Sequence, residues 1–213
     1  MTSVCFLLQA QQVTTYRGLR CLFHHFNLNV SAGELWQVLG PNGSGKTTLL
    51  KLLSGLLPLQ EGQVLWRGHS IHRDRWLYYR ELFYLGHCGA VKEELTVLEN
   101  IRWVLPRSTA SIPLLNTLLE EWQLDHLKHA WVRHLSRGQR QRVALIKLIL
   151  SDTLLWILDE PFSSLDSLAT EKMSKVLETQ VNQGGCVIVA NHSPLTFAGF
   201  LPHTLRLPES VSA

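Results

Sequence analysis

Cysteine is scarce in this sequence and is not arranged for chemistry. The 213 residues include four cysteines, with no C-x-x-C pair. This pattern argues against a disulfide framework and against a zinc site. The N-terminus also lacks a basic segment followed by an apolar run, so no secretory leader is predicted. We therefore expect free thiols in a reducing, cytoplasmic setting.

Long apolar runs and blocks of one charge are absent as well. No apolar run approaches the ~18 residues needed to cross a bilayer, so work at a membrane requires a partner that spans it. The net charge of +3 comes from near-balanced acids and bases, which does not argue for a nucleic acid partner. The scattered arginines are interpreted as solvated surface. They are Arg17, Arg20, Arg73, Arg75 and Arg80.

What the sequence does contain is a glycine-rich loop between two apolar segments. The spacing G-x-x-x-x-G-K-T is met by Gly40, Gly45, Lys46 and Thr47. The segment 35–39 is predicted to be a buried strand and the segment 48–53 a helix, which is the setting of a phosphate-binding loop. Gly43 and Gly45 let backbone N–H groups turn toward an anion, the helix adds its positive end, and Lys46 adds a mobile cation.

Two acidic residues lie at the end of a second apolar segment. The run 154–158 is too apolar to alternate, which predicts a central parallel strand covered on both faces, and Asp159 and Glu160 follow it. Asp159 is placed to hold Mg²⁺ together with Thr47, and Glu160 to orient or deprotonate a water molecule. An acidic pair at this position can also cap a helix. The phosphate-binding loop upstream favours the catalytic interpretation.

Residue spacing elsewhere predicts an α/β core with additions. Further strands are predicted at 7–13, 26–30, 63–66, 82–85 and 186–190. The first two alternate like antiparallel strands. From Thr96 to about Ala130 the spacing is helical, which predicts a helical lobe inserted into the core. A crossover helix is predicted over 167–181 and ends at two glycines. The hydrophobic content of 46% is enough to fill a sizeable core.

A polar turn at 135–139 opens another helix, with Ser136 where an N-cap belongs. Its sequence, Leu-Ser-Arg-Gly-Gln, is similar to the L-S-G-G-Q signature of the ATP-binding-cassette family. The segment 162–166 resembles that family's D-loop, and His192, after the strand 186–190, resembles its switch histidine. The order and spacing of these motifs cover nearly the whole chain, so it is identified as a member of this family.

The resemblance implies the P-loop NTPase fold of ABC type, in a single ATPase domain over 1–213. This fold has a mostly parallel core sheet, an N-terminal antiparallel β subdomain and an inserted helical subdomain, here about 96–150, that carries the signature. The implied cofactors are ATP and Mg²⁺. The implied phosphate-binding residues are Gly40, Pro41, Asn42, Gly43, Ser44, Gly45, Lys46, Thr47 and Thr48. Tyr16 is similar to the aromatic residue that stacks on adenine, although a plain surface tyrosine fits the sequence equally.

The resemblance also implies catalytic roles. Lys46 would neutralise the phosphates, Glu160 would be the general base, and His192 would bind the γ-phosphate and position the water. A lone histidine is usually structural, but the position of His192 after a core strand favours the catalytic role. In this family the signature completes the nucleotide site of a second copy, so ATP closes a head-to-tail dimer and hydrolysis reopens it. The residues concerned are Ser136, Gly138 and Gln139 of the signature and Ser164, Leu165 and Asp166 of the D-loop.

Two positions depart from the family pattern. His87 stands where the family has a glutamine, and when neutral it can still meet the Mg²⁺ shell, whereas its protonated form would repel the metal. Arg137 stands where the signature usually has a second glycine. We expect its side chain to point away from the phosphate, because Ser136 and Gly138 are kept.

Further features resemble the haem exporters of cytochrome c biogenesis, the CcmA family. They are the single compact cassette, the segments 33–35, 40–43, 62–68 and 85–87, Lys92 before 95–96, and the pair 99–100. This resemblance implies an ATPase and translocase subunit, peripheral on the cytoplasmic face of a bacterial inner membrane. Its partners would be integral membrane transporter subunits, CcmB-like and CcmC-like, and no nucleic acid. The alternatives are export of a lipid, peptide or drug, or a soluble switch ATPase.

Overall fold

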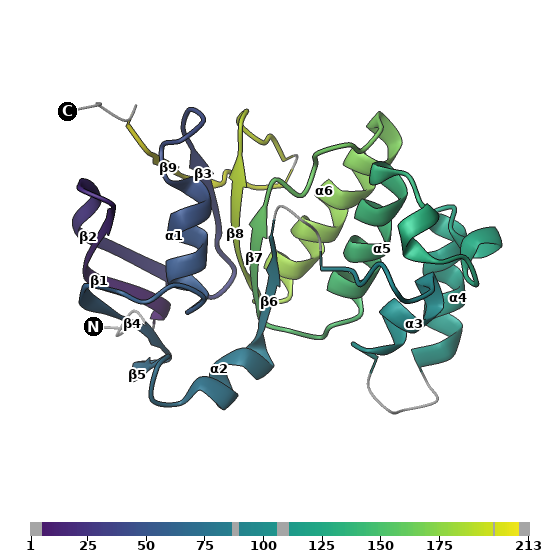
Figure 1. Ribbon diagram of the computed structural model, residues 1–213, viewed down its shortest axis with the longest axis horizontal. Helices are drawn as coiled ribbons and strands as arrows, with labels where there is room; N and C mark the ends of the chain where they lie inside the picture. The colour runs from purple at the N-terminus through teal and green to yellow at the C-terminus, as the bar shows by residue number, and fades with distance from the viewer. Residues whose placement is uncertain (1–5, 87–89, 106–110, 198, 209–213) are drawn as a thin grey trace. The chain divides into compact units, whose positions relative to one another are not determined.

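The computed structural model describes residues 6–86, 90–105, 111–197 and 199–208, and the chain divides into two compact units (Figure 1). The first unit combines residues 1–84, 153–160 and 177–213, and the second combines 85–152 and 161–176. The segment 96–150, in which the helical lobe is predicted, lies inside the second unit.

An antiparallel sheet forms one part of the first unit. Its strands, in spatial order, are β2 (Arg20–Ser31), β1 (Phe6–Arg17), β4 (Glu61–Trp66) and β5 (His69–Ser70). Leu8 and Ala10 on β1 and Val64 on β4 are buried, while their neighbours along the strands are more exposed. This alternation places one face of the sheet on the core. The predicted antiparallel strands at the start of the chain are therefore confirmed.

A second sheet carries the predicted buried strands. Its order is β6 (Leu82–Leu85), β7 (Leu155–Asp159), β8 (Cys186–Asn191), β3 (Leu35–Leu39) and β9 (His203–Arg206). The pairs β7–β8, β8–β3 and β3–β9 are parallel. Every residue of β7 is buried, as expected for a strand covered on both faces. Strand β9 was not among the predicted elements.

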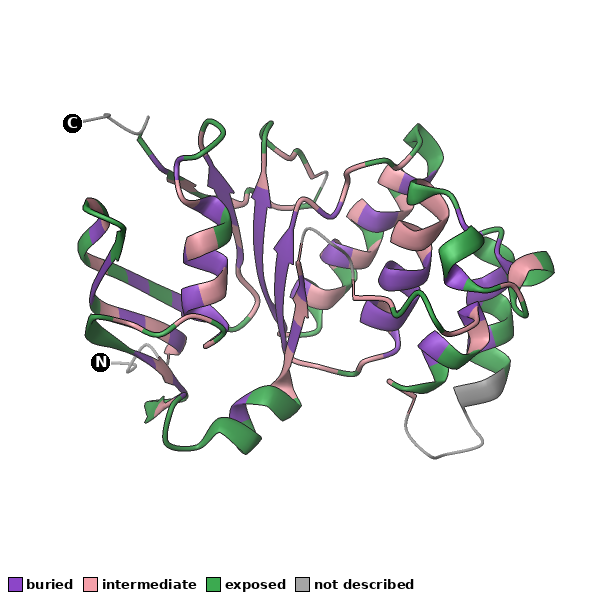
Figure 2. Cartoon of the chain, in the orientation of Figure 1, coloured by how far each residue is buried: buried purple, intermediate pink, exposed green. Residues whose placement is uncertain are grey.

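The core of the first unit lies between the two sheets and the helix that follows the glycine-rich loop. This helix, α1 (Lys46–Leu53), buries Leu49, Leu50, Leu52 and Leu53 (Figure 2). They pack in one cluster with Ile157 of β7 and Ile188 of β8. Burial of each leucine contributes about 1.5–3 kcal/mol. The packed face holds α1 against β8 and against β7, the strand that ends at Asp159.

The second unit is helical. Its elements are α3 (Val97–Arg102), α4 (Ser111–Glu121), α5 (Arg137–Ile149), the start of α6 (Ser167–Asn182), and short 3₁₀ turns at Asp125–Leu127 and Val132–His134. Helix α3 begins with a capping box in which Thr96 and Glu99 satisfy each other's backbone N–H groups. The buried Asn100 amide donates to the Lys92 carbonyl (2.8 Å) and its oxygen accepts from the Lys92 N–H (2.7 Å), which holds the segment before α3.

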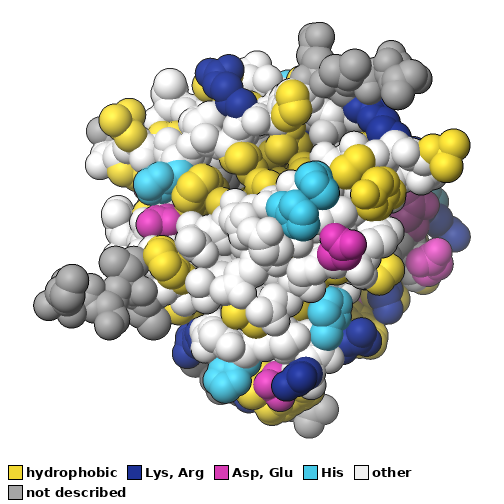
Figure 3. All heavy atoms as spheres, turned by 90° about the vertical axis from the view of Figure 1, so that its left-hand side faces the viewer, with side chains coloured by type: hydrophobic (Ala, Val, Ile, Leu, Met, Phe, Trp, Pro, Cys, Tyr) yellow, Lys and Arg dark blue, Asp and Glu magenta, His cyan; other side chains and the backbone are white. Residues whose placement is uncertain are grey.

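The remaining helix, α2 (Arg75–Glu81), lies in the first unit between β5 and β6. Among the described residues, no helix has the length and apolar character that a membrane span requires. Cys21 and Cys186 carry free thiols, as predicted, and burial raises the pKa of the Cys186 thiol to about 12. On the face in Figure 3, charged side chains of both signs are scattered, and hydrophobic side chains gather beside histidines.

Candidate nucleotide-binding site

The loop between β3 and α1 has a backbone that only glycine adopts easily. Gly43 and Gly45 have φ angles of 78° and 100°, in the left-handed region that L side chains rarely enter. A Cβ atom on Gly40 would lie 2.6 Å from the Ser44 Oγ and 3.0 Å from the Leu207 carbonyl oxygen. The backbone conformation at Gly43 and Gly45 and the close packing at Gly40 thus explain why the loop has glycine at these three positions.

Lys46, the first residue of α1, turns its side chain back into the loop. Its Nζ donates hydrogen bonds to the carbonyl oxygens of Gly40 (2.6 Å) and Pro41 (3.0 Å), and only 6% of the residue is exposed. The Ser44 hydroxyl is also buried and finds no hydrogen-bond partner among the described residues. The first N–H groups of a helix have no partner within it. A cation, a buried hydroxyl and helix N–H groups therefore converge where an anion is expected.

Thr47 and Asp159 bring two hard oxygen atoms together. The Thr47 Oγ1 donates to the Asp159 Oδ2 at 2.7 Å, and Asp159 is only 4% exposed at the end of β7. The Asp159 charge and, more strongly, burial raise the pKa of the neighbouring Tyr84 to about 12. Mg²⁺ prefers one or two protein oxygens completed by phosphate oxygens and water. The pair fits that donor set, and the described residues hold no cluster of three His, Cys, Asp or Glu that would bind a metal alone.

Glu160 and His192 meet because β7 and β8 are parallel and in register. Asp159 pairs with Ala190, so the residues that follow each strand end lie side by side. The Glu160 N–H donates to the Ala190 carbonyl (3.0 Å), and the Glu160 Oε1 lies 2.7 Å from the His192 Nε2. Glu160 reaches this position with a φ of 52°. Such an angle is strained in a residue other than glycine, and here the strained residue carries the carboxylate that meets His192.

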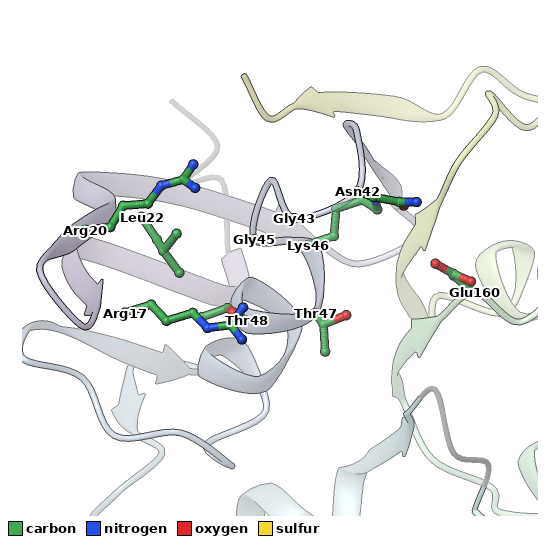
Figure 4. A pocket seen from close by; sticks show the side chains of 10 residues that line it. All are labelled: Arg17, Arg20, Leu22, Asn42, Gly43, Gly45, Lys46, Thr47, Thr48 and Glu160. Carbon is green, nitrogen blue, oxygen red and sulfur yellow. The ribbon is translucent and has the colours of Figure 1, made fainter. Parts of the chain in front are cut away.

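A hollow of about 270 Å³ lies beside the glycine-rich loop, and Lys46, Thr47 and Glu160 line it. Figure 4 shows the side chains that line it. They are Arg17, Arg20, Leu22, Asn42, Gly43, Gly45, Lys46, Thr47, Thr48 and Glu160. Three of them are cationic and one is acidic, so the field in the hollow favours an anion.

The 270 Å³ hollow beside the glycine-rich loop is called the phosphate hollow below. Tyr16 does not line it but lines a neighbouring hollow of about 480 Å³. The residue is 47% exposed, and its pKa is raised chiefly by the opposite Cys21. Thr47 and Thr48 line both hollows. A base resting on Tyr16 would thus lie beside the start of α1, which is compatible with the predicted adenine contact.

The signature residues, all in the second unit, build the start of α5. Ser136 is its N-cap: the Ser136 Oγ accepts from the Gln139 N–H (3.2 Å), and the Gln139 Oε1 accepts from the Ser136 N–H (2.8 Å). The Gln139 side chain is therefore engaged within its own chain. A Cβ on Gly138 would lie 2.8 Å from the Ser164 carbonyl oxygen, so glycine permits the D-loop to approach α5. The Arg137 side chain is exposed.

The predicted D-loop is held by local bonds. Ser164 has a φ of 63°, and the half-buried Leu165 donates its N–H to the Phe162 carbonyl (3.3 Å). Asp166 accepts from the Ala169 N–H at 2.8 Å and pairs with Arg142. The Ala169 bond foremost, and then Arg142, hold the Asp166 pKa below its usual value. His87, the residue predicted in place of the family glutamine, lies outside the described residues.

Comparison with known proteins settles the family. The family model for ABC transporters matches residues 23–163. The chain belongs to the ABC transporter family. Within it, the chain is 40% identical to the cytochrome c biogenesis ATP-binding export protein CcmA of Idiomarina loihiensis, over 94% of this chain and 92% of the relative. It is 41% identical to the CcmA of Nitrosococcus oceani, over 90% and 88%. The predicted membership of the CcmA family is confirmed.

Solved structures agree on the ABC fold. An ATP-binding subunit of an ABC transporter superposes with a TM-score of 0.80 at 27% identity, over 87% of this chain and 79% of that one. A putative ABC transporter ATP-binding protein from Pyrococcus furiosus gives 0.76 at 22% identity, over 94% and 96%, and supports the fold alone. The predicted fold class is therefore confirmed.

Sequence reasoning did not place Arg17 and Arg20 near the glycine-rich loop. They were interpreted as solvated surface, and Arg17 is indeed exposed and Arg20 half-buried, but both line the hollow beside Lys46. The available signal was their position, because they flank the turn that directly follows Tyr16. Scatter along the sequence does not reveal which arginines a turn brings to the same place.

Proposed function

We propose that this chain is the ATP-hydrolysing subunit of a membrane transporter that exports haem for the biogenesis of c-type cytochromes. Its relatives are named cytochrome c biogenesis ATP-binding export proteins. The observation that carries the hydrolytic part is the convergence of two side-chain pairs near one cationic loop. These are Thr47 with Asp159 and Glu160 with His192.

In this proposal, the glycine-rich loop and Lys46 bind the β- and γ-phosphates of ATP. Thr47 and Asp159 hold Mg²⁺, which when bound neutralises charge on the phosphate oxygens. Glu160 accepts the proton of the attacking water. The imidazole of His192, 2.7 Å from that carboxylate, orients it and contacts the γ-phosphate. Tyr16 carries the adenine.

Two copies act together in the proposed cycle. Ser136, Gly138 and Gln139 of one copy complete the nucleotide site of the other, with the D-loop residues 164–166 at the dimer contact. ATP closes this dimer and hydrolysis reopens it, which drives integral membrane subunits of the CcmB-like and CcmC-like kind. The chain is then peripheral, on the cytoplasmic face of a bacterial inner membrane.

The test replaces the gene in its native host with the Glu160→Gln variant and measures haem-stained c-type cytochromes. We expect more than a tenfold loss of holocytochrome at unchanged level of the variant protein, because removing a general base lowers turnover by roughly 10²–10⁴. The matched control is Glu120→Gln, the same chemical change on the exposed side of α4. Normal cytochromes with Glu160→Gln, when the purified variant has lost the ATP hydrolysis that the parent protein shows, would overturn haem export as the function.

A further inference from the structure

Arg17 and Arg20 face each other across the tight turn between β1 and β2. Arg17 is the last residue of β1 and Arg20 the first of β2, and their Cα atoms are partners in the strand register. Only Gly18, with a φ of 62°, and Leu19 connect them. Like charges directly opposite on antiparallel strands destabilise the pairing. The turn therefore carries an electrostatic cost that an anion would relieve.

Neither guanidinium group is neutralised by the part of the chain that the structure describes. Arg67, Arg140 and Arg142 each pair with a carboxylate, whereas the guanidinium groups of Arg17 and Arg20 form no ion pair or hydrogen bond with a described residue. Glu160, the acidic side chain in their hollow, is engaged by His192. Two uncompensated cations thus line the same hollow as Lys46.

Their position along the site identifies the part of a ligand that they would meet. Arg17, Thr47 and Thr48 are the residues common to the phosphate hollow and the Tyr16 hollow. In Figure 4 the Arg17 side chain extends from the turn toward Thr48 at the start of α1, and Arg20 rises from the same turn. A nucleotide with its terminal phosphates in the loop and its base on Tyr16 places its α-phosphate between the two hollows.

We propose that Arg17 and Arg20 form a guanidinium pair that binds the α-phosphate of the nucleotide. This inference rests on the proposed function, because it takes the ligand to be ATP. A guanidinium offers several donors in a fixed plane and matches phosphate oxygens well. The pair contributes to binding of ATP and of ADP alike, since both carry the α-phosphate. Lys46 and the glycine-rich loop act on the terminal phosphates.

The test compares dissociation constants of ATP, ADP and inorganic pyrophosphate, measured by titration calorimetry or by displacement of a fluorescent nucleotide. Arg17→Ala and Arg20→Ala should each weaken ATP and ADP by roughly tenfold, the effect of one charge-assisted hydrogen bond. Pyrophosphate, which fills the loop but has no α-phosphate, should change less than threefold. Arg17→Lys should recover part of the loss, because it restores charge without the planar fork.

The matched control is Arg73→Ala, which removes the same charge from an exposed turn outside these hollows. It should leave all three constants within twofold. Without nucleotide, Arg17→Ala should unfold at the same temperature as the parent or slightly higher, because a like-charge contact is removed. Unchanged ATP and ADP affinities in both alanine variants would overturn the inference, as would an equal loss for pyrophosphate. A wild-type protein that binds no ATP would instead overturn the proposed function.

Discussion

At the residue scale, the backbone of Glu160 is strained, and this strain accompanies the placement of its carboxylate beside His192. Its φ of 52° is a conformation that costs a residue other than glycine about 1–3 kcal/mol. The backbone bond to Ala190 helps to hold it there, and the result is a carboxylate placed 2.7 Å from the His192 imidazole. An unstrained strand continuation would carry the side chain to another position.

This geometry predicts that substitution of Glu160 affects ATP turnover, whereas substitution of Lys46 affects ATP binding. Glu160→Gln keeps the size and the backbone but removes the base, so ATP affinity should stay within a fewfold while turnover falls by roughly 10²–10⁴. Lys46→Ala removes the buried ammonium from the loop and should weaken ATP binding itself. Equilibrium binding and steady-state phosphate release measure the two effects. Turnover of Glu160→Gln close to the parent value would remove Glu160 from the catalytic role.

Sequence patterns reach some residues of the site and not others. Gly43 and Gly45 were predictable, because the motif fixes which positions need a left-handed backbone. The steric need for glycine at position 138 was not predictable. It arises because the Ser164 carbonyl oxygen, on a separate loop, would lie 2.8 Å from a Cβ atom on residue 138. Arg17 and Arg20 likewise become a site only when β1 and β2 pair.

At the element scale, the strand β4 depends on a glycine that admits no side chain. A Cβ on Gly62 would lie 2.4 Å from the carbonyl oxygens of both Gln11 and Gln12 on β1. The β1–β4 register shifts between Gln11 and Thr14, and Gln12 has a φ of 51°. These are the marks of a β-bulge, in which the close approach of two backbones requires glycine.

We predict that Gly62→Ala lowers the free energy of unfolding by about 2–4 kcal/mol, the sum of a left-handed alanine and an overpacked contact. The matched control is Gly68→Ala. Gly68 has a similar φ, 79° against 85°, but its Cβ would meet nothing within 4 Å, so only about 1 kcal/mol should be lost. Urea denaturation followed by circular dichroism measures both. Equal losses would show that backbone conformation alone matters at Gly62.

Elements with strong periodicity were predictable, and those defined by long-range pairing were not. The apolar runs of β7 and β8 and the alternation of β1 specify strands locally. Strand β9 has no such pattern over His203–Arg206. It forms because it pairs with β3, where His203 stacks on Trp36 with ring centroids 4.8 Å apart and the Gln37 amide donates to the Thr204 hydroxyl at 2.7 Å.

At the scale of the whole molecule, the predicted catalytic residues and the signature belong to different units. Lys46, Glu160 and His192 lie in the first unit, and Ser136 and Gly138 in the second. Within the second unit, the signature is capped by its own residues and packed against the Ser164 carbonyl. The helical lobe that the spacing predicts, about 96–150, lies within the second unit. The same unit includes 161–176, and with it the predicted D-loop, which the spacing did not indicate.

The proposed dimer predicts that ATP changes the oligomeric state of the Glu160→Gln protein. Because hydrolysis is blocked, ATP should convert monomer to dimer, and light scattering coupled to gel filtration measures the mass.

Adding Ser136→Ala to the Glu160→Gln protein should prevent the shift from monomer to dimer, since the partner's nucleotide site loses a hydrogen-bond donor. This substitution also removes the N-cap of α5, at about 1 kcal/mol. Thr96→Ala removes the equivalent cap of α3 and is the matched control. Dimers in the control but not in Ser136→Ala would assign the Ser136 hydroxyl to the second copy, whereas dimers in both would remove this hydroxyl from the dimer contact.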